Sequence, residues 1–505
     1  MALEGRATAL EALAGGRGAV VWQRLIADIE TPVSAALKLV EPGRGDWVLE
    51  SVESGETRGR YSMIGLDPDL MFEARGDAAR INRDWRADPA AFTPLAAPTL
   101  QALRDLVAEC RFDVPDALPK ALTTLVGFFA YETFGLVERI PRAPGEGLGL
   151  PDMVFVRPTV ILVFDRLADE LFLIAPIWPD AGGAIDRMID AAQDRLDDIA
   201  ARLSTLSAHR ERATTDALPG DVTAIPATSP ERFAEMVATA KDYIAAGDIF
   251  QVVLSQRFST PFDLPPFDLY RALRRINPSP FLYFLDLPGF AIIGSSPEIL
   301  VRVREGEITI RPIAGTRPRG RTSAEDAENR ESLLADPKER AEHLMLLDLG
   351  RNDVGRAAIG GSVTVTDSYT VEFYSHVMHI VSNVIGRIAP DKDAIDALFA
   401  GFPAGTVSGA PKVRACQIIA ELEADARGPY AGGVGYFAPD GNMDSCIVLR
   451  TAIVKDGEMH VQAGAGIVAD SDPAYEQREC EAKAGALFAA AREAVRLAGT
   501  PGYGQ

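Results

Sequence analysis

The chain has 505 residues, which is enough for two or three domain-sized units or for one large interleaved unit. Apolar residues make up 47% and charged residues 24% of the chain, an ordinary balance for a soluble globular protein. The 51 Lys and Arg residues face 72 Asp and Glu residues, so the formal net charge is −21. This balance argues against a nucleic-acid-binding protein, and a small anionic substrate would need a local pocket of arginines, backbone N–H groups or metal.

The cysteines and the lack of long apolar runs indicate the cellular compartment in which the protein is expected. The four cysteines form no Cys-x-x-Cys pair, which fits a reducing environment. They are Cys110, Cys416, Cys446 and Cys480. Residues 1–21 lack the basic and then apolar order of a secretory signal, and no run approaches the roughly 18 apolar residues of a membrane span. We therefore expect a soluble cytoplasmic protein without membrane or nucleic-acid partners.

The first part of the chain is predicted to be mainly β. Residues 1–20 are rich in Ala and Gly, and we expect them to be frayed or loosely docked. Gly127, inside an apolar run, predicts a buried strand that something approaches closely. A long amphipathic helix follows over residues 184–206. The strands are expected at residues 47–52, 60–65, 122–131, 154–164 and 170–177.

A polar segment divides the chain. Residues 207–228 contain two prolines and show no periodicity, which is typical of a linker. We therefore expect an extension over residues 1–20, an N-terminal domain over 21–206, this linker, and a second domain over 229–497. Strands and helices are mixed rather than strictly alternating, which favours an α+β fold over a doubly wound sheet.

Two stretches resemble each other as helix starts. They are Asp336-Pro337-Lys338-Glu339-Arg340-Ala341-Glu342 and Asp472-Pro473-Ala474-Tyr475-Glu476-Gln477-Arg478-Glu479. Each has a capping Asp, a Pro in the first turn and a Glu-x-x-Glu pair on one helix face. If the helices converge, Glu342 and Glu479 would hold one Mg²⁺, which accepts one or two protein carboxylates and leaves its other positions to water and an anionic ligand. Alternatively, the acids only complement the helix dipole, with Glu339 in a capping box. The first helix is expected to end at Gly350 in the left-handed conformation.

The segment His460–Ala469 carries Gly464 and Gly466 after a predicted strand. A dinucleotide fingerprint would open a helix at those glycines, but here the strand continues and the helix starts only at Pro473. Glycines within a strand instead allow a ligand to reach backbone N–H groups. A carboxylate bound there would lie near any metal on Glu479.

Two further loops concentrate glycine, proline or positive charge. Residues 403–412 precede a predicted helix and lack the Gly-Lys-Ser/Thr ending of a phosphate-binding loop. They fit an ordinary helix start, or an anion site at a helix N-terminus to which Lys412 adds charge. Residues 312–321 contain three arginines, which fits a solvated basic loop.

Arg450 and His379 lie inside apolar runs. Residues 447–454 predict a strand, and a buried arginine there needs an anionic partner, so Arg450 is a candidate for gripping a carboxylate with two hydrogen bonds. His379 would serve either as a satisfied core histidine or as an acid–base group.

Taken together, a series of motifs resembles the chorismate-utilising enzymes, and among them the large subunits that form anthranilate. The motifs are Gly247–Val253, Gly294–Glu298, Pro312–Gly320, Glu342–Leu349, Phe402–Lys412, Tyr430–Tyr436 and Gln462–Gly466. The resemblance covers nearly the whole chain and is densest in its C-terminal two-thirds. It implies a large, interleaved, two-lobe fold of β-sheets and helices within the α+β class.

The resemblance also implies roles for individual residues. Glu342 and Glu479 match Mg²⁺ ligands, with Glu339 as a contact through water, and Glu298 matches a proposed general acid. The other matching active-site positions are Gln251, His379 and Thr406. The positions that match chorismate-binding residues are Gly315, Thr316, Tyr430, Arg450, Gly464, Ala465 and Gly466.

The implied chemistry adds ammonia to the chorismate ring, removes the 4-hydroxyl with a proton from Glu298, and then removes pyruvate to give anthranilate. Glu298 would donate near neutral pH only if burial or neighbouring acids raise its pKa. Relatives that add water have a lysine at the position of Gln251, which cannot act as a base, and aminodeoxychorismate synthases have a nucleophilic lysine at that of Ala314. The absence of lysine at both positions favours direct use of ammonia and anthranilate as the product. The alternatives are an aminodeoxychorismate-forming enzyme and a catalytically silent, tryptophan-binding regulatory subunit.

The resemblance implies two partners besides chorismate. The chain contains no evident glutaminase segment, so we expect a separate glutamine amidotransferase subunit that supplies ammonia within a hetero-oligomer. The N-terminal domain resembles the family's regulatory part, with L-tryptophan as feedback inhibitor. The matching residues are Glu50, Ser51, Pro280, Phe281 and Leu282. Many members have Tyr-Met where Phe281-Leu282 stand, so the apolar wall is kept and a hydroxyl is lost.

Overall fold

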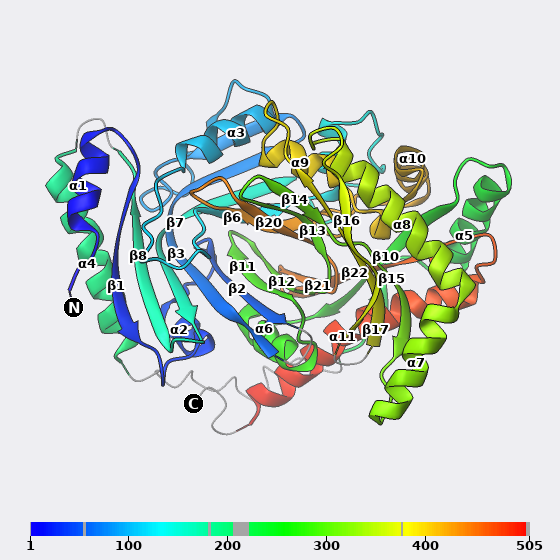
Figure 1. Cartoon of the computed structure of the whole chain (residues 1–505). Coiled ribbons are helices and arrows are strands. Elements are labelled where there is room, and N and C mark those ends of the chain that lie inside the picture. The colour runs from blue at the N-terminus through cyan, green and yellow to red at the C-terminus, as the bar shows by residue number, and fades with distance from the viewer. Residues whose placement is uncertain (1, 54–56, 180–182, 206–221, 375–376, 501–505) are drawn as a thin grey trace.

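The computed structural model describes residues 2–53, 57–179, 183–205, 222–374 and 377–500 (Figure 1). Its helices are α1 (Arg6–Ala14), α2 (Pro32–Leu39), α3 (Thr99–Glu109), α4 (Ile185–Leu203), α5 (Pro230–Ala245), α6 (Pro266–Ile276), α7 (Ser323–Ala335), α8 (Pro337–Gly355), α9 (Ala394–Gly401), α10 (Lys412–Leu422) and α11 (Pro473–Ala498), with short 3-10 helices η1 (Tyr131–Leu136) and η3 (Gly405–Val407). The first strands are β1 (Ala19–Ile26), β2 (Asp46–Glu53), β3 (Thr57–Arg75), β4 (Ala78–Asn82), β5 (Thr93–Pro94), β6 (Leu125–Phe129), β7 (Met153–Asp165), β8 (Glu170–Ile177), β9 (Ile225–Pro226), β10 (Gln251–Pro261) and β11 (Phe281–Leu287). The others are β12 (Phe290–Ser296), β13 (Ile299–Arg304), β14 (Glu307–Ile310), β15 (Ile313–Pro318), β16 (Thr364–Phe373), β17 (Val377–Arg387), β18 (Gly409–Ala410), β19 (Gly433–Phe437), β20 (Met443–Ile447), β21 (Thr451–Lys455) and β22 (Glu458–Ile467).

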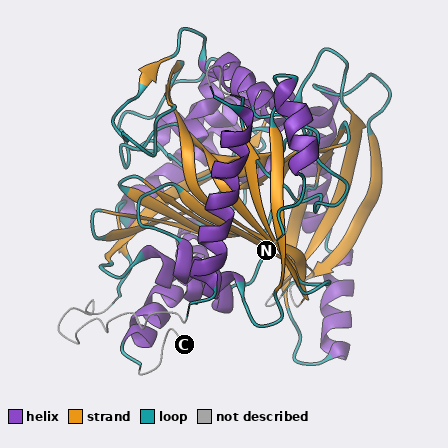
Figure 2. Cartoon of the chain, turned by 90° about the vertical axis from the view of Figure 1, so that its left-hand side faces the viewer, coloured by secondary structure: helices purple, strands orange, loops and turns teal. Residues whose placement is uncertain are grey.

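The strands form one branched, antiparallel network around β3 and β7. A first arm runs from β7 through β6, β19, β20, β13, β14 and β17 to β15 and β16. A second arm runs from β3 through β2, β11, β12, β21 and β22 to β10. Figure 2 shows the strands as twisted layers with most helices on the outside. The predicted α+β class is confirmed.

Several elements of the N-terminal half match their predictions. The antiparallel pair of β7 and β8 and the helix α4 are present close to the predicted bounds. Gly127 in β6 is the point of close approach, because a Cβ there would lie 1.9 Å from the carbonyl oxygen of Val154 in β7.

The N-terminal residues are well packed, contrary to the expectation of a loose extension. Helix α1 contacts α4 and β1, with Ala9 and Leu13 only 2% and 6% exposed. Backbone hydrogen bonds of 2.8 and 3.2 Å join Glu4 to Trp22. Ala9 and Leu13, four residues apart, lie on the face of the helix that is buried.

Both halves of the chain contribute strands to each arm. β2 pairs with β11 and β6 pairs with β19, so strands from residues 21–206 and 229–497 are neighbours. Within the described part of the predicted linker, β9 pairs with β10. The remainder, residues 207–221, lies outside the described residues, and the division into domains stays a prediction.

Helix α8 does not end at Gly350 as predicted but continues to Gly355. Gly350 lies where the helix passes Pro312, and a Cβ there would approach the Pro312 Cγ to 3.0 Å. The glycine therefore allows close packing and does not terminate the helix.

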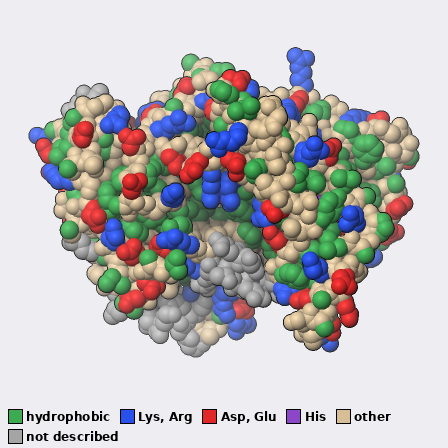
Figure 3. Space-filling model, in the orientation of Figure 1, with side chains coloured by type: hydrophobic (Ala, Val, Ile, Leu, Met, Phe, Trp, Pro, Cys, Tyr) green, Lys and Arg blue, Asp and Glu red, His purple; other side chains and the backbone are tan. Residues whose placement is uncertain are grey.

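None of the helices in the described residues has the length and apolar character that a membrane span requires. Figure 3 shows acidic and basic side chains scattered over this face of the molecule. The cytoplasmic location stays a prediction.

Candidate active site

Two chain segments cross between the arms side by side, and each carries a predicted site residue. One joins β12 to β13 and contains Glu298, and the other joins β20 to β21 and contains Arg450. The Ser295 N–H donates to the Arg450 carbonyl oxygen at 3.1 Å, and the Ile447 N–H donates to the Glu298 carbonyl oxygen at 3.1 Å. The strand predicted over residues 447–454 is therefore broken, because Arg450 has a φ of 48° that a regular strand does not allow.

Glu298 is a buried acid, 8% exposed. Its Oε1 accepts a hydrogen bond from the Thr406 Oγ1 at 3.1 Å. Burial raises the pKa of Glu298 to about 8, although this hydrogen bond and the charge of Arg450 act in the opposite direction. A carboxyl group with this pKa is mostly protonated at neutral pH and is able to donate a proton.

Arg450 is a half-buried cation near this acid. Burial lowers its pKa, while Tyr374 and Glu298 act to raise it. Among the described residues, no carboxylate oxygen lies within 4.0 Å of its guanidinium nitrogens. A desolvated guanidinium of this kind fits an anionic ligand, because a carboxylate would satisfy two of its N–H groups at once.

His379 connects β17 to the irregular part of β15. Its Nδ1 lies 3.0 Å from the Gly315 carbonyl oxygen and 3.1 Å from the Thr316 Oγ1. Gly315 has a φ of 71°, and the β15–β17 register shifts at this residue. Burial lowers the pKa of His379 to about 4, so the ring is neutral at pH 7 and donates through Nδ1 to the carbonyl oxygen.

The glycines of β22 lie beside Tyr430 and Gln251. A Cβ at Gly464 would be 2.8 Å from the Tyr430 Oη, and a Cβ at Gly466 would be 2.4 Å from the Gln251 Nε2. β10 pairs with this stretch on one edge, whereas β21 pairs with β22 only as far as Val461. Beyond that point, one edge of β22 has no strand partner among the described residues.

The two predicted acidic helices converge. Burial raises the pKa of Glu342 in α8, and the nearby charges of Glu339 and Glu479 raise it further. Glu479 in α11 accepts from the Lys483 Nζ at 2.7 Å, and the same ammonium donates to the Gly464 carbonyl oxygen at 2.9 Å. Within the described residues, His, Cys, Asp and Glu side chains form no metal-binding group of three or more.

The start of α8 differs in detail from its prediction. Asp336 caps the helix, accepting from the Lys338 N–H at 2.9 Å and the Glu339 N–H at 3.3 Å. Glu339 forms no capping box, because the Asp336 N–H donates to Leu333 and the Glu339 carboxylate accepts from the Arg317 Nη1 at 3.1 Å.

The two basic features also have structural partners. In the predicted basic loop, Arg317 donates to Asp336 at 2.7 Å, and Arg319 donates to Asp326 at 2.9 Å, so these arginines are not simply solvated. The Lys412 Nζ is buried and donates to both carboxylate oxygens of Asp353, at 3.0 and 2.9 Å. This ion pair supports the reading of an ordinary helix start rather than an anion site.

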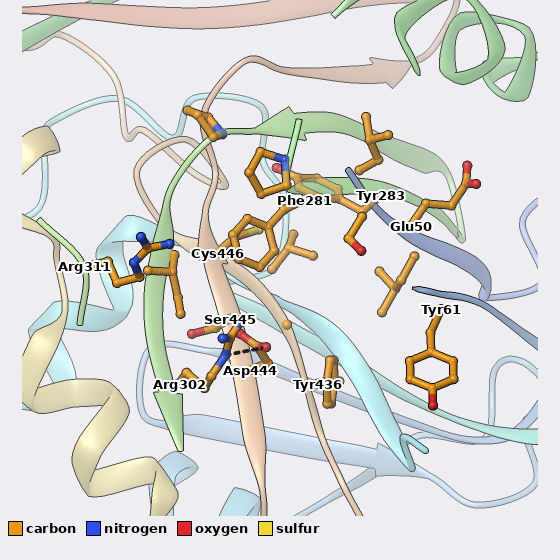
Figure 4. A pocket seen from close by; sticks show the side chains of 18 of the residues that line it. Glu50, Tyr61, Phe281, Tyr283, Arg302, Arg311, Tyr436, Asp444, Ser445 and Cys446 are labelled. Atoms are coloured by element: carbon orange, nitrogen blue, oxygen red, sulfur yellow. Dashed lines mark hydrogen bonds and ion pairs between the residues drawn. The ribbon is translucent and has the colours of Figure 1, made fainter. Parts of the chain in front are cut away.

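The five residues predicted for regulation line one cavity of about 1030 Å³ (Figure 4). They are Glu50, Ser51, Pro280, Phe281 and Leu282. The carboxylate of Glu50 turns away from Phe281 in Figure 4. It accepts hydrogen bonds from Arg274 at 2.9 and 3.0 Å, from Tyr270 at 2.7 Å and from Arg166 at 2.7 Å. Although burial alone would raise the pKa of Glu50, Arg274 and these other partners hold it below its usual value.

The sequence patterns did not single out several residues around these sites. Tyr374 lines the cavity, yet its ring also lies 5.4 Å from the His379 ring. Tyr436 and Asp444 line the cavity too, and Arg427 is buried beside Tyr430. Tyr436 lies within a motif that carries the resemblance and Arg427 lies three residues before it, whereas Tyr374 and Asp444 lie outside the motifs, so no pattern in the sequence pointed to them.

Comparisons with known proteins agree on one family. The model of the chorismate binding enzyme matches residues 52–489. Anthranilate synthase component 1 of Cereibacter sphaeroides is 50% identical over 489 residues, which cover 97% of each chain. That of Aquifex aeolicus is 44% identical, covering 93% of this chain and 94% of the relative.

Solved structures agree with the sequence comparisons. Anthranilate synthase component I from Streptococcus pneumoniae TIGR4 superimposes with a TM-score of 0.74 at 35% identity, covering 92% of this chain and 99% of the other. The menaquinone-specific isochorismate synthase MenF from Escherichia coli has a TM-score of 0.71 at 18% identity and shares the fold. The chain therefore belongs to the chorismate binding enzyme family, and within it to the group of anthranilate synthase component 1 proteins.

Proposed function

We propose that the chain converts chorismate and ammonia into anthranilate and pyruvate, as the large subunit of a two-component lyase. The observation that carries this proposal is Glu298, a buried carboxyl with a pKa of about 8 beside Arg450. Departure of the 4-hydroxyl of chorismate requires a proton, and an acid with this pKa supplies one near neutral pH. The names of the relatives support the same reaction.

Substrate binding follows from the charges around this acid. Chorismate carries two carboxylates, and we assign one of them to the Arg450 guanidinium, which would hold it with two parallel hydrogen bonds. Backbone N–H groups of Gly464 and Gly466, together with the Tyr430 hydroxyl, would orient the rest of the ring. Fixing the ring at two ends places the 4-hydroxyl near Glu298 and lowers the entropic part of the barrier.

The converging acidic helices fit a Mg²⁺ ion. The mutual repulsion of Glu342, Glu339 and Glu479 is relieved by a divalent cation, and carboxylate oxygens are the ligands that Mg²⁺ prefers. Glu342 and Glu479 would hold the ion, with Glu339 contacting it through water. When bound, Mg²⁺ would neutralise the second carboxylate of chorismate. Lys483 bridges Glu479 and Gly464, so it links the metal-binding helix to the glycine strand.

We propose ammonia as the nucleophile because this chain lacks a lysine at two positions where relatives with a different chemistry have one. Gln251 and Ala314 stand where relatives that use water or a covalent lysine have a lysine. The Gln251 Oε1 is buried and has no hydrogen-bond partner among the described residues. We assign it the role of accepting an N–H of ammonia, which would orient the nitrogen lone pair toward the ring. The neutral His379 would orient Thr316 and Gly315 at the opposite wall.

The proposed function implies two partners, a subunit that supplies ammonia and an inhibitor. A separate glutamine amidotransferase, component 2, would supply the ammonia in a hetero-oligomer. L-Tryptophan would occupy the cavity between Ser51 and Phe281 and inhibit by favouring an inactive arrangement of the arms. Because the carboxylate of Glu50 is already engaged by Arg274, we assign Glu50 the role of holding β2 against α6.

Product identification tests the proposal. The purified chain is incubated with chorismate, Mg²⁺ and an ammonium salt, without any partner protein, and the products are separated and identified by mass. Anthranilate and pyruvate in equal amounts are expected. Aminodeoxychorismate would instead indicate the related synthase. The absence of any product, together with tryptophan binding, would indicate a catalytically silent regulatory subunit.

A further inference from the structure

Arg427 joins several segments that surround the proposed chorismate site. Its side chain is 1% exposed, and its guanidinium makes four hydrogen bonds. Nε and Nη2 donate to the two carboxylate oxygens of Glu423, at 2.8 and 2.6 Å. Nη1 donates to the Val407 carbonyl oxygen at 2.8 Å, and Nη2 donates to the Val253 carbonyl oxygen at 2.7 Å. One buried side chain thus holds the backbone of two segments that are distant in sequence.

Each of these segments carries a residue of the site. Val407 follows Thr406, whose hydroxyl donates to the proposed acid. Val253 lies in β10, where it pairs with Gly466 of β22. The guanidinium carbon also lies 5.5 Å from the centre of the Tyr430 ring. The guanidinium therefore links the Thr406 loop to the strand that pairs with the glycine strand, in addition to the direct 2.9 Å hydrogen bond from the Val253 N–H to the Ser408 carbonyl oxygen.

The Glu423 carboxylate, which pairs with Arg427, and the backbone N–H of Arg427 make further hydrogen bonds to neighbouring segments. The Glu423 Oε1 accepts from the Ser255 N–H at 2.8 Å and from its hydroxyl at 3.0 Å, and Ser255 pairs with Gly464. The Arg427 N–H donates to the Glu132 Oε1 at 2.7 Å, which brings the N-terminal half of the chain into the same cluster.

Stability alone does not explain a buried charge pair at this place. The cost of desolvating both ions offsets most of their attraction, and apolar side chains of similar size often serve stability equally well. Apolar side chains would fill the space without fixing the direction of a carbonyl group, whereas a planar guanidinium fixes several directions at once. We propose that Arg427 is a positioning residue that sets the spacing between the Thr406 loop and the glycine strand, an inference that rests on the proposed function and adds a residue to that site.

Two variants and one matched control test this role. Arg427→Lys keeps the positive charge opposite Glu423 but loses the fork, and the double variant Glu423→Gln/Arg427→Met removes both charges together. Arg157→Lys is the control, because Arg157 is also a buried arginine, with a side chain 8% exposed against 1% for Arg427. It pairs with Asp69 through two 2.8 Å hydrogen bonds and lies 4.7 Å from the Trp178 ring. Arg157 lies in β7 and has no hydrogen bond to the Thr406 loop or the glycine strand.

The expected result is a loss of kcat/KM for chorismate of about 100-fold in both Arg427 variants, since small misplacements of a site have effects of this size. The Arg157→Lys control, shown to be folded by its Tm, should keep the wild-type kcat/KM. Wild-type kcat/KM in either folded Arg427 variant would overturn the proposal, and so would an equal loss of activity in the control. If wild type and control form no anthranilate, the proposed function fails by itself. Calorimetric chorismate binding then tests Arg427, whose variants should bind more weakly than the control.

Discussion

The Thr406 hydroxyl donates a 3.1 Å hydrogen bond to the Glu298 carboxyl, and this is the polar side-chain contact that the buried acid makes among the described residues. The bond favours the ionised form of Glu298, whereas burial favours the neutral form and is the stronger influence. Burial therefore supplies the high pKa of the proposed proton donor, and the Thr406 hydrogen bond limits that pKa.

The first prediction concerns the acid itself. Glu298→Gln keeps the shape of the side chain but removes the proton to be donated, so kcat should fall about 10²- to 10⁴-fold. Chorismate binding, measured by calorimetry, should change little because Arg450 remains. Normal turnover in this variant would assign the proton donor to another group.

The second prediction concerns pH and Thr406. With Glu298 as the proposed proton donor, activity should decline as pH rises through about 8, because the carboxyl group then loses its proton. Thr406→Val removes the hydrogen bond that favours the ionised form, so the alkaline limb of the kcat profile should move to higher pH. Thr406→Ser keeps the hydroxyl and is the matched control. If the alkaline limb of the kcat profile lies at the same pH in both variants, the Thr406 hydroxyl does not limit the pKa of Glu298.

The burial of Glu298 also makes the stability of the folded chain depend on pH. The pKa of Glu298 is raised from 4.5 to about 8 in the folded chain, so the folded state binds more protons than the unfolded state between these values. The contribution of this group to stability is fully present below pH 4.5 and is lost as pH rises toward 8. Chemical denaturation of Glu298→Gln across this window should show a smaller loss of stability than the wild type.

The third prediction concerns the acidic helices. Glu342→Gln or Glu479→Gln should raise the Mg²⁺ concentration for half-maximal activity by at least about tenfold. Calorimetry with Mg²⁺ and chorismate provides a readout that does not depend on turnover. Glu328→Gln changes an exposed Glu of α7 with the same Glu-x-x-Glu spacing, and this control should leave the Mg²⁺ requirement unchanged. Unaltered Mg²⁺ dependence in Glu342→Gln would refute the assignment.

The fourth prediction concerns the regulatory cavity. Ser51→Phe fills the space beside Phe281 and should raise the tryptophan concentration for half-inhibition by about tenfold or more, with kcat in the absence of tryptophan unchanged. Inhibition curves at fixed chorismate measure the shift. Unchanged inhibition would place the inhibitor elsewhere in the molecule.

Local patterns predicted much of the fold because their causes are local. The capping residues Asp336 and Asp472, the antiparallel pair β7–β8 and the close approach at Gly127 all lie where propensity and periodicity place them. The α+β class followed from the mixture of elements, but the branching of the network depends on pairings between distant strands such as β6 and β19, and no short window of sequence encodes those pairings.

The errors have specific physical causes. Arg450 lies in a left-handed conformation within an apolar run, and composition cannot reveal a change of φ at one residue. Gly350 resembles a helix terminator but serves a contact with Pro312, which is distant in sequence. Glu339 has the spacing of a capping box, yet Arg317 from β15 competes for its carboxylate. In each case a tertiary contact overrides a local preference.

The crossing between the arms has a consequence for communication across the molecule. Pro297 lines the large cavity, while Glu298, the next residue, contacts Thr406 at the acid site. A molecule that presses on one wall of that cavity would thus displace the proposed proton donor through a single peptide unit, with no relay of intervening side chains. Inhibitor and substrate would compete over the position of one short stretch of backbone without ever touching each other.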